Sequence, residues 1–148
     1  MSFSDYYENA VLAHLFQNLA IINIGDVTGL DKSTTNGALW VALHTASPGE
    51  AGDQTTSEAA YTGYARVSVS RNASWTVAAN QVTNAAAVQF PTSTGGTATV
   101  THFSVGVDDG VTLGVNTMIA FGALASPLTI VSGVQPQFAA GALVITLD

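Results

Sequence analysis

The chain has 148 residues, of which 47% are hydrophobic and only 9% are charged, and its formal net charge is −7. Its only cations are Lys32, Arg66 and Arg71, so it lacks the clustered positive charge that displaces counterions from phosphates, and direct binding to nucleic acid is excluded. The lack of cysteine excludes disulfides, thiol nucleophiles and zinc–thiolate sites, and no apolar run approaches the roughly 20 residues that cross a bilayer, so no membrane partner is expected.

Residues 4–19 are predicted to form the one helix of the chain. Their apolar side chains make a continuous stripe, as in a helix docked on a sheet or on a neighbouring subunit: Val11, Leu12, Leu15, Phe16 and Leu19. Ser4 or Asp5 can cap this helix, and Asp5 with Glu8 resembles a capping box. The same two acidic residues lie where a signal peptide would be basic, so none is expected.

Turns and strands follow the helix. Residues 20–36 are rich in turn residues, and Asp26 and Asp31 lack the oxygen spacing of a calcium loop. Residues 37–45 alternate as a strand, with Leu39, Val41 and Leu43 on one face and Trp40, Ala42 and His44 on the other. Residues 46–58 form a polar loop that carries three acidic residues, and both partner contact and a flexible surface loop stay open for it.

Further short strands recur about every ten residues, separated by Gly, Pro, Asn and Asp clusters. They are predicted at 61–70, 71–79, 86–90, 100–107, 111–113, 117–124, 128–131, 137–138 and 143–147. Residues 108–110 (Asp-Asp-Gly) are typical of a hairpin turn. The pattern predicts a mainly β fold, an antiparallel β-sandwich (jelly-roll-like or Ig-like) of about nine short strands with one N-terminal amphipathic α-helix. Residues 1–148 are expected to form a single domain, with the helix over 4–19 and the strands over 37–148.

The histidines do not suggest catalysis. His14 lies beside the apolar stripe of the helix, whereas His44 and His102 fall in strands, and all three are interpreted as structural. No G-x-S-x-G nucleophile motif occurs. Thr45 and Thr101 place hydroxyls next to His44 and His102 in sequence, but neighbours in a strand point to opposite faces.

Carboxylates give no clear site either. Asp108 and Asp109 are the only adjacent pair and lie in a predicted turn. A glycosidase-like pairing among Glu50, Glu58 and Asp108 is not excluded by the sequence, and nothing supports it. No HxH or HExxH spacing occurs. We therefore expect no enzyme activity, no catalytic or cofactor-binding residues, and no metal site.

Sugar binding is the non-catalytic alternative, because exposed aromatic side chains stack on sugars in lectin-like sandwiches. Four aromatic residues are available for such stacking: Trp40, Tyr61, Tyr64 and Trp75. They lie within strand patterns, so burial in the core is the simpler interpretation.

Seven segments follow one another along the chain: SDYYENAVLAHLF, LWVALHTASPGEAG, GYARVSV, VTNAAAVQFPT, TVTHFSVGV, IAFGAL and FAAGALVITLD. In this order they resemble a family of tailed-bacteriophage virion proteins, whose members are tail-fibre proteins or capsid decoration (cement) proteins. The resemblance covers nearly the whole chain. Residues 20–36 and the segment VDDGVTLGVNT depart from the pattern.

The resemblance implies a structural protein without catalysis. A chain of this length without coiled-coil heptads or a glycine-repeat shaft is a poor fibre by itself, so we expect a decoration protein on the outer surface of the capsid. Its partners would be the major capsid protein and two further copies of itself in a homotrimer. A tail or tail-fibre component, with binding to host-surface carbohydrate, is the alternative. Aromatic and acidic residues are the predicted partner contacts: Tyr6, Tyr7, Glu50, Asp53, Tyr61 and Trp75.

Overall fold

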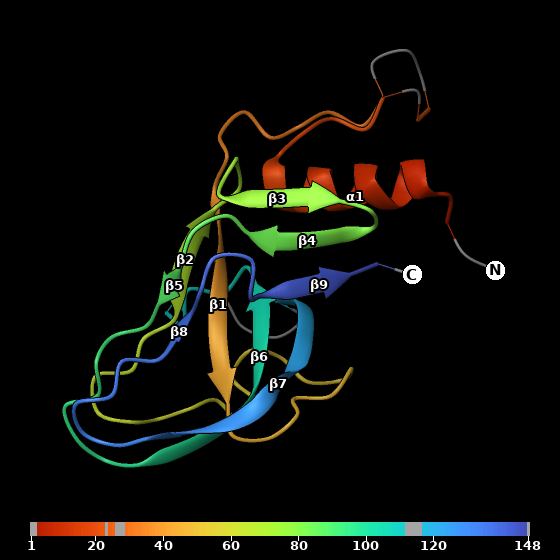
Figure 1. The fold of residues 1–148 in the computed structure, drawn as a ribbon. Helices are drawn as coiled ribbons and strands as arrows, with labels where there is room; N and C mark the ends of the chain where they lie inside the picture. The colour runs from red at the N-terminus through yellow and green to blue at the C-terminus, as the bar shows by residue number, and fades with distance from the viewer. Residues whose placement is uncertain (1–2, 23, 26–28, 112–116, 148) are drawn as a thin grey trace. The chain divides into compact units, whose positions relative to one another are not determined.

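The computed structural model describes residues 3–22, 24–25, 29–111 and 117–147. Within them the chain forms one helix and nine strands in antiparallel sheets, which confirms the mainly β class, consistent with a β-sandwich (Figure 1). The chain divides into two compact units, residues 1–38, 70–87 and 138–148 in the first and residues 39–69 and 88–137 in the second. The single-domain organisation stays a prediction.

The first unit is a helix on a three-stranded sheet. Helix α1 (Asp5–Gln17) lies alongside β3 (Trp75–Ala78) and β4 (Gln81–Asn84), and β9 (Val144–Thr146) completes the sheet in the order β3-β4-β9 (Figure 1). Leu12 and Phe16, from the predicted stripe, are buried, and the Phe16 ring meets the Trp75 ring edge to face with 4.9 Å between centroids. This aromatic pair, together with the hydrogen bond from the Gln17 side chain to Trp75 O at 2.7 Å, holds the helix on the sheet.

Both ends of α1 differ from the prediction. Ser4 is the N-cap but makes no side-chain cap bond, so the predicted capping box does not form. The helix ends at Gln17 because Asn18 adopts the left-handed conformation, with φ 55°. The Asn18 side chain is buried and binds both backbone groups of Ser33, which turns the chain away from the helix axis.

The second unit holds a four-stranded sheet in the order β2-β1-β6-β7. These strands are β1 (Ala38–His44), β2 (Val67–Ser70), β6 (Ala98–Gly106) and β7 (Met118–Ile130), and a separate two-stranded sheet joins β5 (Val88–Gln89) to β8 (Gln137–Phe138). Strands β5 and β6, which flank the turn-rich 91–97 segment, thus belong to different sheets. The register of β1 on β6 runs from Trp40 opposite Gly106 to His44 opposite His102.

Strand β1 is buried on both faces. Leu39, Val41 and Leu43 face the core as their alternation predicts. On the other face Ala42 and His44 are also fully buried, and the 46–58 loop contacts this strand where Gln54 donates to Trp40 O and where Thr56 O lies 2.8 Å from His44 Nδ1. A strand covered on both faces is typical of a sheet centre.

Several strand boundaries differ from the prediction. Residues 61–66 form no strand, since Tyr64 N–H donates to Tyr61 O in a turn where Gly63 has φ +94°. The strands predicted at 117–124 and 128–131 are one strand, β7, interrupted by an irregularity in which residues 124–127 face Thr101 alone. Asp26 and most of the strand predicted at 111–113 lie outside the described residues.

Candidate functional site

Gln54 anchors the 46–58 loop of the second unit to the sheet. Its side chain is fully buried, and its amide donates to Trp40 O at 2.9 Å and to Ser104 Oγ at 3.4 Å. Asp108 N–H donates to Gln54 Oε1 at 3.3 Å. A Cβ at Gly106 would overlap this Gln54 side chain, so glycine at that position makes room for the loop. The Gln54 side chain therefore connects the middle of the loop to β1, β6 and the turn after β6, and the two alternatives for the loop as a whole stay predictions.

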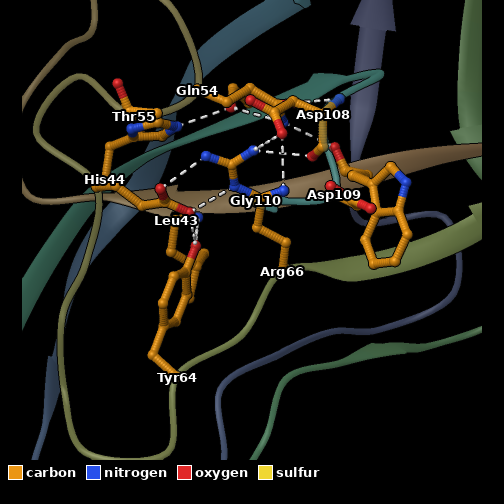
Figure 2. A network of polar contacts seen from close by, with 12 residues as sticks. Leu43, His44, Gln54, Thr55, Tyr64, Arg66, Asp108, Asp109 and Gly110 are labelled. Carbon is orange, nitrogen blue, oxygen red and sulfur yellow. Dashed lines mark hydrogen bonds and ion pairs between the residues drawn. The ribbon is translucent and has the colours of Figure 1, made fainter. Parts of the chain in front are cut away.

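His44 and Ser104 form a pair next to Gln54. His44 Nε2 lies 2.7 Å from Ser104 Oγ, and His44 Nδ1 lies 2.8 Å from the carbonyl oxygen of Thr56 (Figure 2 shows His44 beside Gln54). A carbonyl only accepts, so Nδ1 carries the proton and Nε2 accepts from the serine hydroxyl. Burial lowers the pKa of His44, which keeps the ring neutral.

Ser104 and His44 are in hydrogen-bond contact, as a catalytic nucleophile and its base would be, but a substrate cannot reach the serine hydroxyl. Both side chains have 0% exposure, so no substrate atom reaches the hydroxyl in this arrangement. His44 thus joins β1 to β6 through Ser104 and contacts the 46–58 loop through the carbonyl oxygen of Thr56, and both contacts hold segments of the second unit together.

His102 shows where one argument from the sequence is wrong. Thr101 Oγ1 and His102 Nδ1 lie 2.9 Å apart although the two residues are neighbours in a strand. A register shift between Val100 and His102 breaks the alternation of faces there. The Thr101 hydroxyl donates to Thr45 O at 3.0 Å, so it accepts from the imidazole and is not activated by it.

Arg66 joins two acidic residues from distant parts of the second unit. Its guanidinium donates to both carboxylate oxygens of Glu58, at 2.7 and 2.8 Å, and to Asp108 O at 2.8 Å (Figure 2). Asp108 Oδ1 lies 3.3 Å from Nη1. Hydrogen bonding to Glu58 raises the pKa of Arg66, so the cation is permanent. Glu58 and Asp108 do converge, but on a cation and not across a substrate cleft.

Tyr64 and Gly110 complete this network. The Tyr64 hydroxyl donates to Glu58 Oε1 at 2.8 Å and accepts from Leu43 N–H at 3.1 Å. Burial, and then the charge of Glu58, raise the pKa of Tyr64, so the phenol stays protonated. Gly110 has φ +86° and its N–H donates to Asp108 Oδ1 at 2.8 Å, so the chain bends at residues 108–110, whereas the hairpin predicted there stays a prediction because residues 112–116 lie outside the described part of the chain.

The network forms the floor of a pocket of about 400 Å³. Three segments contribute: the 46–58 loop, the segment 64–66 and the turn at 109–110, with β1 on one side. Its lining combines aromatic, acidic, basic and small side chains: Trp40, Thr55, Glu58, Tyr64, Ala65, Arg66, Asp109, Gly110 and Val111. It holds no histidine and no cluster for a metal, and within the described residues no group of three or more His, Asp or Glu could hold an ion.

The predicted contact residues fall in different settings. In the first unit Tyr6 is 55% exposed and packs edge to face on the half-buried Tyr7, with 5.1 Å between ring centroids. In the second unit Glu50 is exposed, whereas the Asp53 carboxylate accepts from Thr55 N–H and Oγ1 within its own loop. Their contact with a partner stays a prediction.

Tyr61 and Trp75 lie inside their units. Tyr61 is 3% exposed and its hydroxyl donates to Pro91 O at 2.9 Å, and Trp75 is 1% exposed. Neither side chain presents surface to a partner in this structure. Sequence reasoning instead missed Gln54 and Ser104, which carry no motif.

The fold and its site define a class: a β-structured protein whose buried polar side chains hold loops to its strands and whose second unit carries a pocket. Within the described residues no helix is long and apolar enough to cross a membrane. The family model described as Podophage GP4 fiber I protein gp80 matches residues 2–146, and the chain belongs to this family. It is thus a phage virion structural protein of a fibre family. No curated protein matches the chain.

Proposed function

We propose that the chain is a non-catalytic structural component of a podophage tail fibre. The single observation that carries this proposal is the fibre-family match over residues 2–146. It favours the alternative drawn from the sequence over the head-decoration hypothesis, for which the absence of heptads was the main argument. That absence does not oppose a fibre built from β-modules, because a short globular module can be one part of a longer fibre.

The site supports a structural role. Polar groups with catalytic potential are turned inward: His44 binds Ser104, and Arg66 binds Glu58 and Asp108. The first contact joins β1 to β6, and the second holds the end of the 46–58 loop and the turn after β6 on one guanidinium. A protein that works by holding its shape needs such fixed loops, whereas an enzyme needs reactive groups that a substrate can reach.

Antibody-gold labelling of intact virions by electron microscopy tests the proposal. Antibodies against the purified chain are expected to place gold on the tail or its fibres. Gold spread over the head would overturn the fibre proposal in favour of capsid decoration, with the major capsid protein as partner. A preparation lacking the chain is the control for nonspecific gold.

We also propose self-association, as a homotrimer. No charged residue occurs between Asp109 and Asp148, so a long part of the chain carries no charge that repels a second copy. Strand β7 lies within this part and at one edge of its sheet. Edge strands without charge favour pairing between chains.

A further inference from the structure

The structure separates the four aromatic side chains that could stack on a sugar. Tyr61 and Trp75 are buried, whereas Trp40 and Tyr64 are half-buried and line the same pocket of the second unit. From this convergence we propose that the pocket above Glu58 and Arg66 binds a neutral sugar ring, as a terminal hexose or one unit of a surface polysaccharide.

The lining has the two kinds of surface that a sugar needs. A pyranose ring has apolar C–H faces and a polar edge of hydroxyls, and aromatic rings cover such faces while carboxylates accept from hydroxyls. Trp40 and Tyr64 supply the aromatic surface. Glu58, whose side chain is 20% exposed, supplies the carboxylate. Apolar walls with a few placed polar groups are typical of small-ligand sites.

The polar floor is in place before a ligand arrives. Both oxygens of Glu58 are held by Arg66, and one also accepts from Tyr64. The Arg66 side chain is only 3% exposed and is bound to Asp108 as well. Binding therefore does not have to order these side chains, which lowers its entropic cost.

Charge and size narrow the ligand class. Glu58 and Asp109 outweigh Arg66 in the lining, and the whole chain carries −7, so anionic sugars such as uronic or sialic acids are disfavoured. A volume of about 400 Å³ lies at the small end of the range of about 300–1,000 Å³ for ligand pockets, which suits one ring better than an extended oligosaccharide.

This inference deepens the proposed function, because a sugar site on a fibre contacts the host surface. The fibre proposal and the sugar-site proposal can be refuted separately. Gold on the tail without sugar binding would support the fibre proposal and refute the sugar site. Gold on the head with sugar binding would refute the fibre proposal and support the sugar site.

The test uses the purified full chain on an array of neutral and anionic glycans, followed by NMR titration with free neutral hexoses. We expect binding to neutral glycans that weakens about tenfold or more in Trp40→Ala, with Trp40→Phe retaining most of it. Phe3→Ala, at an exposed aromatic residue of the first unit, is the matched control and should bind like the wild type.

A second variant guards against loss of folding. Ala65 is exposed and lines the pocket, so Ala65→Gln should obstruct the pocket with little effect on the thermal midpoint. Weaker sugar binding at unchanged stability supports the proposal. It is overturned if the wild type binds no neutral glycan, if it binds only anionic ones, or if Trp40→Ala and Ala65→Gln bind as the wild type does.

Discussion

Arg66 shows how one residue links distant segments of the second unit. Its guanidinium lies between Glu58, at the end of the 46–58 loop, and Asp108, in the turn after β6. Asp108 is 1% exposed, so its charge depends on Arg66 for compensation. A buried ion pair adds little net stability, but its disruption is costly because an unpaired charge stays in the interior.

Replacement of Arg66 by Met is expected to lower the free energy of unfolding by about 3–5 kcal/mol, because the buried Asp108 carboxylate loses its partner. Urea unfolding followed by circular dichroism measures this change. Lys32→Met is the control, since Lys32 is exposed and its replacement should alter stability by about 0.5 kcal/mol or less. Equal effects of the two substitutions would contradict a structural role for the ion pair.

His44 makes stability depend on pH. Burial lowers the pKa of His44 in the folded chain below its ordinary value of 6.5, so the unfolded chain binds more protons at mildly acidic pH. Stability should therefore be complete above about pH 6.5 and fall as the pH drops below it. Urea midpoints across pH 5–8 measure this slope for wild type and His44→Gln. An unchanged slope in the variant would show that another group is responsible.

Residue patterns predicted part of this site. The alternation of β1 placed Leu39, Val41 and Leu43 on one face, which is buried, and the Asp-Gly signal marked a bend at residues 108–110. The partners of Arg66 could not be predicted, because they come from residues 8 and 42 positions away and no local pattern records that distance. Gln54 is one of many polar residues in its loop, and only the fold shows that it is buried.

At the scale of elements, the 46–58 loop and β6 fit one another at Gly106. Any side chain at this position would meet Gln54 and the carbonyl oxygen of Thr117. The loop can dock only where the strand carries no Cβ, so a glycine within a strand marks a close approach of another segment.

Gly106→Ala is expected to destabilise the chain by about 1–3 kcal/mol and to release the loop, because the added methyl group displaces Gln54. Limited proteolysis within residues 46–58, together with urea unfolding, measures both effects. Gly95→Ala is the matched control, since a Cβ there makes only ordinary contacts with Thr62. Cleavage rates that match between Gly106→Ala and wild type would refute the docking role of Gly106.

Asn18, at the C-terminal end of α1, allows the contribution of backbone conformation to stability to be measured apart from that of side-chain hydrogen bonds. Asn18 supplies both a left-handed residue and two hydrogen bonds to Ser33. Asn18→Gly keeps the backbone conformation and should cost the bonds alone, about 1 kcal/mol, whereas Asn18→Ala should cost more because it adds backbone strain. Thermal unfolding of the two variants tests the order, and equal losses would contradict it.

Elements were predictable where patterning was strong and local. The helix was expected at 4–19 and occupies Asp5–Gln17, and a left-handed Asn ended it before Leu19. The two strands predicted at 117–124 and 128–131 are one strand in the structure, because the sheet accommodates the residues between them as an irregularity in β7. Which strands pair with each other could not be predicted from local patterns, since β5 pairs with β8 across a separation of about fifty residues.

At the scale of the whole molecule, charge is distributed unevenly along the chain. Ten acidic residues oppose three basic ones, and the segment between Asp109 and Asp148 has neither. Repulsion between like charges opposes self-association. Salt screens this repulsion, with a Debye length of about 10 Å at 0.1 M and about 3 Å at 1 M. An uncharged segment is where copies of such a chain can meet without repulsion.

Sedimentation equilibrium tests the proposed homotrimer. We expect a trimer whose dissociation constant falls as salt is raised from about 0.1 to about 1 M, because screening reduces repulsion between chains of charge −7. A monomer at all salt concentrations would contradict self-association of the isolated chain.

The copy number per virion tests the fibre assignment most directly. Quantitative mass spectrometry of purified virions gives the ratio of this chain to the major capsid protein. A fibre component is expected at the low ratio of other tail proteins, and it should separate with tails when particles are disrupted. A copy number comparable with that of the capsid protein, recovered with heads, would contradict the fibre assignment and establish capsid decoration.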